Sequence, residues 1–303
     1  MKRKKIKFHK RHFVMGLGGI LILTFGGLFL YARFFPQHYQ YKTFSDRVVE
    51  NYVPPEAATP SGIKTPKPSL KIGAGKVRVP ILLYHYVEIN HDIRDTQRTK
   101  LSVTPYWFEK QLQYLTDNGY TTITFTDLYQ AIMTGKKLPA RPVILTFDDG
   151  YRDFYTDAWP LLKKYNASAT AFIVPGFLDK PNYMYTWQLS EIATDSARLV
   201  TIGAHTLHHV SLPSVSKEKA VEEISQSKAV LEAKFHQPVT IFCYPYGSFS
   251  ADIVAAVKAA GYQMAASTIF GATESVDNLF DLPRIRVGNY AGRAFAARLA
   301  VTP

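Results

Sequence analysis

Cysteine is almost absent from this chain: Cys243 is the single cysteine among 303 residues. An intramolecular disulfide is therefore excluded, and an exported domain would have to depend on a large core for its stability. The net positive charge is also small once the first twelve residues are set aside. Those residues carry seven Lys or Arg of a net charge of +12, which leaves about +5 for the remainder. The sequence thus lacks the basic face typical of a nucleic-acid-binding protein.

Residues 13–32, FVMGLGGILILTFGGLFLYA, form a stretch of twenty residues without a charge. At about 1.5 Å per residue, a helix of this length spans the roughly 30 Å hydrocarbon core of a bilayer. The basic segment 1–12 precedes it, and no small-residue cleavage site follows. We predict a transmembrane signal anchor, with residues 1–12 in the cytoplasm and the rest of the chain on the outer side of the cell membrane. A cleaved signal peptide is the alternative.

The remainder divides into a spacer and one folded domain. Residues 33–77 are rich in Pro, Gly, Lys and Ser, which is typical of an extended linker. From residue 78 to 303, strand-like apolar runs alternate with helix-like segments such as 216–235 and 250–262. This alternation predicts an α/β fold with parallel strands, and about eight strands favour a (β/α) barrel over an open sheet. The expected strands are 79–84, 121–125, 142–147, 169–174, 199–204, 239–243, 263–267 and 284–287.

Polar side chains follow several of these strands at the point where each strand ends. They are His85, Asp148, Asp149, His205, His209 and the segment YPYG at 244–247. In a (β/α) barrel these positions share the C-terminal rim, where active sites are built. Two imidazoles and one carboxylate are a common ligand set for zinc, and either acid could supply the carboxylate. The other acid could then act as general base and His85 as general acid, while His208 is interpreted as a bystander.

Two motifs resemble a known family. TFDDG at 146–150 and HTLHH at 205–209 resemble the signatures T-F-D-D-G and H-[ST]-x-x-H of the polysaccharide deacetylases with NodB homology, carbohydrate esterase family 4. FCYPYG at 242–247 resembles the third motif of that family, R-x-P-Y-G. The resemblance covers about residues 78–290 and implies an irregular (β/α) barrel of the NodB type.

The resemblance also implies roles for individual residues. Asp148 matches the catalytic base, and Asp149, His205 and His209 match the ligands of a divalent metal ion, normally zinc. The backbone N–H of Tyr246 matches a group that binds the oxyanion of the tetrahedral intermediate, and Pro245 and Gly247 flank it in the motif.

The sequence departs from the family pattern at two places. Cys243 stands where the third motif has an arginine that orients the base, and no L-x-H motif with an acid histidine follows residue 250. The opening VPILLYHYV resembles the poly-N-acetylglucosamine deacetylases, in which an early Tyr-His pair supplies the acid; we therefore assign His85 to that role. We predict that Arg284 or Arg286 replaces the missing guanidinium.

The expected function is metal-dependent hydrolysis of N-acetyl groups on a cell-surface polysaccharide, with a poly-N-acetylglucosamine-like exopolysaccharide favoured as substrate. A peptidoglycan N-acetylglucosamine deacetylase is the first alternative, and an O-deacetylase would need the same chemistry. A non-catalytic glycan-binding protein on the same fold is the alternative from another class, supported by the missing arginine. Candidate aromatic residues for stacking on sugar rings are Tyr84, Tyr86, Tyr151, Trp187 and Tyr244.

Overall fold

The computed structural model describes residues 75–300. The predicted cytoplasmic segment 1–12, the predicted anchor 13–32 and nearly all of the predicted linker 33–77 lie outside the described residues. Within residues 75–300, none of the helices combines the length and the apolar character that crossing a bilayer requires.

The centre of the fold is a curled parallel β-sheet. Its strands are β2 (Ile81–Tyr84), β5 (Thr121–Thr122), β6 (Pro142–Phe147), β7 (Ala169–Ile173), β8 (Val200–Ala204), β9 (Ile241–Cys243), β10 (Met264–Ala266) and β12 (Ile285–Arg286). Their order is β10-β9-β8-β7-β6-β2-β12, and β5 pairs with the beginning of β6. A parallel bridge from Ala266 to Leu282 links β10 to the segment that leads into β12. The two ends of the sheet therefore approach each other. The predicted α/β class is confirmed, and the curled parallel sheet, which forms a half-barrel, fits the irregular (β/α) barrel of the NodB type that was expected.

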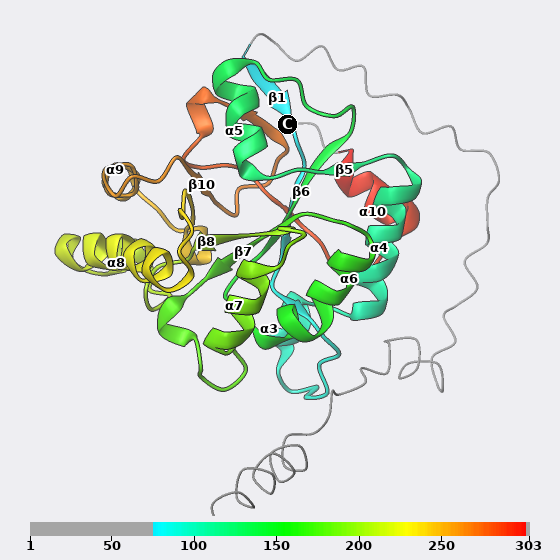
Figure 1. Ribbon diagram of the computed structural model, residues 1–303, viewed down its shortest axis with the longest axis horizontal. Helices are drawn as coiled ribbons and strands as arrows, with labels where there is room; N and C mark the ends of the chain where they lie inside the picture. The colour runs from blue at the N-terminus through cyan, green and yellow to red at the C-terminus, as the bar shows by residue number, and fades with distance from the viewer. Residues whose placement is uncertain (1–74, 301–303) are drawn as a thin grey trace, which may run out of the picture. The chain divides into compact units, whose positions relative to one another are not determined.

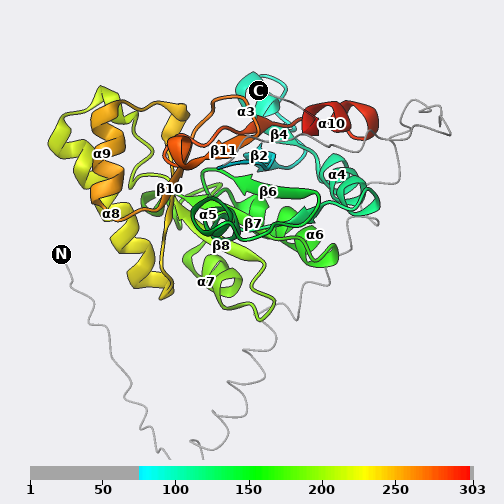
Figure 2. The same cartoon turned by 90° about the horizontal axis from the view of Figure 1, so that it is seen from above.

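Helices surround this sheet, as Figures 1 and 2 show. They are α3 (Thr96–Leu101), α4 (Pro105–Asp117), α5 (Phe125–Thr134), α6 (Trp159–Lys164), α7 (Thr186–Thr194), α8 (Lys217–Phe235), α9 (Ala251–Ala259) and α10 (Gly292–Leu299), with a short π-helix at Phe154–Ala158 before α6. Two small pairings complete the fold: β1 (Lys76–Arg78) with β11 (Thr273–Ser275), antiparallel, and β3 (Tyr86–Val87) with β4 (Ser102–Val103), parallel.

The predicted strand at 121–125 is the one expectation about strands that fails in large part. The Thr124 hydroxyl accepts a hydrogen bond from the N–H of Asp127, whose carboxylate in turn accepts from the N–H of Thr124. This reciprocal capping starts α5 at Phe125, so β5 ends at Thr122. The β-branched run 121–125 suggested a longer strand because the capping signal, Thr124 with Asp127, spans only four residues and overlaps the end of the run.

Side-chain alternation along the strands produces two hydrophobic cores. Ile81, Ile144 and Phe172 point into the space enclosed by the sheet, together with side chains of β9, β10 and α5. The next residues along, such as Leu82 and Leu145, pack outward in a larger core that includes residues of the surrounding helices. Because successive side chains of a strand face opposite sides, every second residue of each strand faces the interior. Side chains of that parity at the C-terminal ends of the strands therefore lie at the mouth of the enclosed space.

Candidate active site and metal centre

The C-terminal ends of β6, β8 and β9 bring the predicted site residues together. Asp148 and Asp149 follow β6, His205 follows β8, and Cys243 ends β9. Asp148 keeps the inward parity of Ile144 and Thr146, and its N–H donates to the Tyr84 carbonyl as if the strand continued. Asp149 has a φ of 75°, in the left-handed region, so the chain turns sharply between the two acids. The neighbouring carboxylates therefore serve two different clusters.

The first cluster consists of Asp149, His205 and His209, whose ligand atoms lie within 4.8 Å of one another. The Nε2 atoms of His205 and His209 are 3.3 and 3.1 Å from the same oxygen, Asp149 Oδ1. That oxygen is buried and has no hydrogen-bond partner among residues 75–300. The three side chains converge on one point, as a shared cation requires.

The protonation of the His205 ring explains why a cation fits between its Nε2 atom and Asp149 Oδ1. His205 Nδ1 lies 2.7 Å from the Cys243 carbonyl, which can only accept, so Nδ1 carries a proton. In the neutral imidazole, Nε2 then presents a lone pair to a carboxylate oxygen, and the two repel unless a positive charge lies between them. Burial alone would lower the pKa of His205, but the neighbouring Cys243 and Asp149 raise this pKa well above its ordinary value. A metal ion could replace the proton that this environment favours.

A second group of possible metal ligands consists of Asp148, His205 and Cys243. Its atoms are already occupied, because both oxygens of Asp148 and the thiol of Cys243 contact the guanidinium of Arg284. A cation there would be repelled by the arginine. The Asp149 cluster is therefore the better metal site.

Arg284 makes a bidentate ion pair with Asp148. Its Nη1 and Nη2 donate to the two carboxylate oxygens at 2.7 and 2.8 Å, and its side chain is fully buried. The guanidinium also donates to Thr146 Oγ1 at 3.1 Å, and Nε donates to the Ser267 carbonyl at 2.7 Å. Arg286 is exposed at the end of β12. Of the two arginines predicted from the sequence, Arg284 is the one in contact with Asp148.

This ion pair controls the charge of Asp148. Burial alone would raise the pKa of the carboxyl group, but the charge and hydrogen bonds of Arg284 outweigh burial and lower the pKa below its ordinary value. Asp148 therefore stays ionised at neutral pH, in the state that a general base needs.

His85 lies directly after β2, beside the ion pair, and is partly exposed. Burial lowers the pKa of its imidazole below the ordinary value, although the carboxylates of Asp148 and Asp149 act in the opposite direction. Its position after β2 puts it on the same rim as the two acids, since β2 pairs with β6.

The turn Pro245–Gly247 after β9 carries Tyr246, which is 68% exposed and has a φ of 61°. The Tyr246 hydroxyl lies 3.2 Å from His209 Nδ1, a contact that the sequence did not suggest. If Nδ1 donates in this contact, Nε2 of His209 is free to ligate. Asp149, His209 and Tyr246 all have a positive φ, so backbone strain is concentrated at the site, as is common at functional sites.

Two of the five aromatic candidates for sugar stacking are wrong. Tyr84 and Tyr244 are 1% and 0% exposed, because they belong to the outer core between sheet and helices. Tyr86 and Tyr151 stack on each other and are partly exposed, and Trp187 is 58% exposed.

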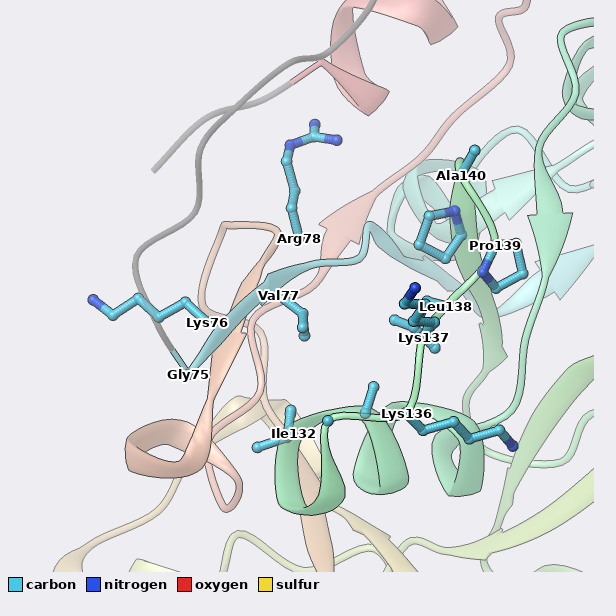
Figure 3. Close-up of a pocket in the computed structure, with 13 residues that line it drawn as sticks. Gly75, Lys76, Val77, Arg78, Ile132, Lys136, Lys137, Leu138, Pro139 and Ala140 are labelled. Atoms are coloured by element: carbon cyan, nitrogen blue, oxygen red, sulfur yellow. The ribbon is translucent and has the colours of Figure 1, made fainter.

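A surface pocket of about 450 Å³ lies at the other end of β6 (Figure 3). It is lined by residues of β1 and of the α5–β6 connection, among them Lys76, Arg78, Lys137 and Pro142. None of the predicted site residues lines this pocket. The pocket contains Pro142, the first residue of β6, whereas Asp148 follows the last residue of that strand.

The fold and the site have the parts of a hydrolase that activates water: an Asp–His–His group beside an ionised carboxylate, at the mouth of a curled parallel sheet. Comparison with known proteins agrees. The profile of the family described as "Polysaccharide deacetylase" matches residues 135–265.

Three relatives illustrate the similarity. YxkH of Bacillus subtilis (strain 168), provisionally named a polysaccharide deacetylase, is 32% identical over 243 residues, which are 80% of each chain. The poly-beta-1,6-N-acetyl-D-glucosamine N-deacetylase of Staphylococcus aureus (strain MSSA476) is 27% identical over 63% of this chain and 69% of its own length. The structure of the Streptococcus pyogenes deacetylase PplD in complex with acetate is 29% identical, with a TM-score of 0.64, and the match covers 70% of this chain and 92% of that one.

The chain belongs to the polysaccharide deacetylase family, carbohydrate esterase family 4 with NodB homology, whose members are hydrolases acting on the amide bonds of acetylated polysaccharides.

Proposed function

We propose that this protein removes N-acetyl groups from a poly-N-acetylglucosamine-like polysaccharide at the outer cell surface, using a zinc ion held by Asp149, His205 and His209. The convergence of two imidazole nitrogens on Asp149 Oδ1 is the observation that carries the proposal. Bound there, zinc would supply a Lewis acid and a nucleophile derived from water at neutral pH.

Two side chains of the protein carry out the proton transfers, Asp148 as the base and His85 as the acid. Asp148, held ionised by Arg284, accepts a proton from the attacking water. The N–H of Tyr246, between Pro245 and Gly247, donates to the oxygen on which negative charge develops. A donor of this kind lowers the barrier by about 3 kcal/mol. His85 gives a proton to the departing amine, and acetate and a free glucosamine unit are the products.

The substrate and the location are inferred from the sequence and its relatives. The S. aureus relative is named for poly-beta-1,6-N-acetyl-D-glucosamine, and the early Tyr-His pair here is Tyr84-His85. The uncharged stretch 13–32 behind a basic segment favours a single membrane anchor with the catalytic domain outside. A polymer at the cell surface would then be within reach of the site.

The alternative of a non-catalytic glycan-binding protein was supported by the third motif, in which Cys243 stands in place of the family's arginine. That support is weakened because Arg284 brings a guanidinium to Asp148 from another part of the chain. Peptidoglycan remains the competing substrate, since the catalytic residues would act on its N-acetylglucosamine in the same way.

A side-by-side assay tests the choice of substrate. Acetate release by the full chain, loaded with zinc, is measured on purified poly-N-acetylglucosamine and on purified peptidoglycan at equal N-acetyl concentration. We expect at least tenfold higher kcat/KM on poly-N-acetylglucosamine. A preference for peptidoglycan would contradict the proposed substrate but not the chemistry, and release from neither would contradict the proposed activity.

A further inference from the structure

The loop that carries two of the three proposed metal ligands is strained. It runs from His205 to His209, and Thr206 and His209 have φ values of 59° and 58°. Residues other than glycine rarely adopt this conformation, which persists only where surrounding contacts impose it. The Thr206 hydroxyl is buried and has no hydrogen-bond partner among the described residues, so this side chain does not hold the loop.

Glu223 of α8 holds the middle of this loop. Its carboxylate accepts from the N–H of His208 at 2.8 Å and pairs with His208 Nδ1 at 2.9 Å. Its backbone carbonyl accepts from the N–H of Leu207 at 3.1 Å. The Glu223 side chain is completely buried, and Lys219 one turn earlier lies 3.1 Å from the same carboxylate. A buried carboxylate is tolerated only when donors surround it, and most of these donors belong to the loop.

Gly176 holds the loop from the other side. Its N–H donates to the Leu207 carbonyl at 2.9 Å, and a Cβ added to it would lie 2.5 Å from that oxygen and 2.7 Å from the His208 ring. Both peptide groups of Leu207 are thus fixed, and the His208 ring lies between Gly176 and Glu223. The half-exposed His208, which the sequence suggested to be a bystander, is part of the support.

We propose that Glu223 and His208 are positioning residues that latch the loop 205–209 in its strained conformation and so set the affinity of the metal site. Neither touches the proposed metal ion. They fix the peptides before His209, and this directs His209 Nε2 toward Asp149 Oδ1 at 3.1 Å. The inference rests on the metal site put forward under the proposed function.

The main test is Glu223→Gln in the full chain, with Glu222→Gln as matched control. Glu222 is the preceding residue of α8, is exposed, and also pairs with Lys219 at 3.1 Å. Two quantities are measured: hydrogen exchange of the His208 amide in metal-free protein, with the Leu207 amide as internal reference because it donates to the Glu223 backbone carbonyl, and the affinity for Zn²⁺ alone by calorimetry. The glutamine keeps the size of the side chain and one acceptor oxygen, but it loses the negative charge and its NH₂ group cannot accept a hydrogen bond, so only one of the two oxygens that meet His208 remains an acceptor.

We expect Glu223→Gln to speed exchange of the His208 amide at least tenfold relative to the Leu207 amide and to weaken zinc binding by about tenfold, the low end of the range for residues that orient metal ligands. Glu222→Gln should change both by less than twofold. A folded Glu223→Gln variant with wild-type exchange and affinity would overturn the latch, as would equal effects in the two variants. A wild-type protein that binds no zinc would overturn both the latch and the metal site.

His208→Ala decides the matter if Glu223→Gln does not fold. The ring is half-exposed, and its removal leaves the backbone contacts of Glu223 in place. We expect the variant to stay folded, because the N–H of residue 208 and Lys219 still donate to Glu223, with zinc binding weakened at least threefold; unchanged affinity would overturn the proposal. Zinc binding that depends on Glu223, in a protein that releases no acetate, would support the latch and contradict the proposed deacetylase activity.

Discussion

Replacing Arg284 by lysine tests the link between the buried ion pair and catalysis. Lysine keeps the positive charge, but its ammonium cannot match the two carboxylate oxygens of Asp148 as the planar guanidinium does at 2.7 and 2.8 Å. The contacts with Thr146 and the Ser267 carbonyl would also be lost or weakened. Since at least one charge-assisted hydrogen bond disappears, we expect about 2 kcal/mol of lost stability. Arg284→Ala would cost about 3–5 kcal/mol, because it leaves a buried carboxylate unpaired.

The catalytic effect should appear in kcat rather than in KM. A positioned general base contributes about 10²- to 10⁴-fold, so a displaced Asp148 should lower kcat by about 100-fold. Arg284 lowers the pKa of Asp148, and the base acts only when ionised. A weaker partner lets this pKa rise, and the acidic limb of the pH–rate profile should therefore move to higher pH.

The assay is acetate release from an N-acetylglucosamine oligomer over a range of pH, with thermal unfolding measured in parallel. Arg286→Lys is the matched control, because Arg286 lies two residues further along and is exposed. We expect this control to stay within twofold of the wild type. A folded Arg284→Lys variant with unchanged kcat and pH profile would refute the reasoning, and a larger effect in Arg286→Lys would assign the role to the other arginine.

Three further predictions concern the metal, a partly buried acid and the packing of the interior. Chelation of the metal should abolish acetate release and added Zn²⁺ should restore it; activity that survives complete chelation would contradict the metal requirement. His209→Ala should weaken zinc binding by more than about 100-fold, which exceeds the effect of losing a residue that only orients a metal ligand. Burial raises the pKa of Asp153 to about 7, so the folded protein holds this proton more tightly than the unfolded chain, and stability should fall as the pH rises from about 4 to 7. Asp153→Asn should remove this loss of stability. By denaturation, the variant should be more stable than the wild type by about 2 kcal/mol above pH 7 and equally stable below pH 4; this figure is half of the free energy that the pKa shift alone implies, because the residue is partly exposed. A difference in stability that does not depend on pH would contradict the assignment. In Gly203→Ala, the new Cβ would lie 2.5 Å from the Phe172 ring, so urea denaturation should show about 1–3 kcal/mol of destabilisation; an unchanged midpoint would show that the interior adapts.

The order of the strands along the chain could be predicted because buried parallel strands leave long apolar runs. Seven of the eight expected strands correspond to β2, β6, β7, β8, β9, β10 and β12, each within a few residues. The gathering of Asp149, His205 and His209 followed from the rule that strand ends share one rim. The run 121–125 misled because a local cap at Thr124 outweighed strand propensity.

Contacts between distant segments were harder to predict. The sequence offered Arg284 and Arg286 as equal candidates, and both have the same side-chain parity; their position along the chain separates them, because Arg284 precedes β12 and is buried whereas Arg286 ends β12 and is exposed. The support of the ligand loop by Glu223 carried no local signal, because Glu223 lies in the middle of a helix with many charged residues. The same holds for Tyr246, whose hydroxyl meets His209 through two loops that come together only in the fold.

The proposed role of Asp148 as the base of a zinc-dependent deacetylase is tested most directly by acetate release from poly-N-acetylglucosamine, with the zinc-loaded wild type and Asp148→Asn measured together. The substitution preserves shape but removes both the ability to take up a proton and the charge that pairs with Arg284, so thermal unfolding is measured in parallel. Because Asp148 is not a ligand of the proposed metal site, zinc affinity of the folded variant should stay within a few-fold. We predict acetate release by the wild type and a fall of at least 100-fold in Asp148→Asn. Equal rates in the two proteins, or no release by the wild type, would contradict the account.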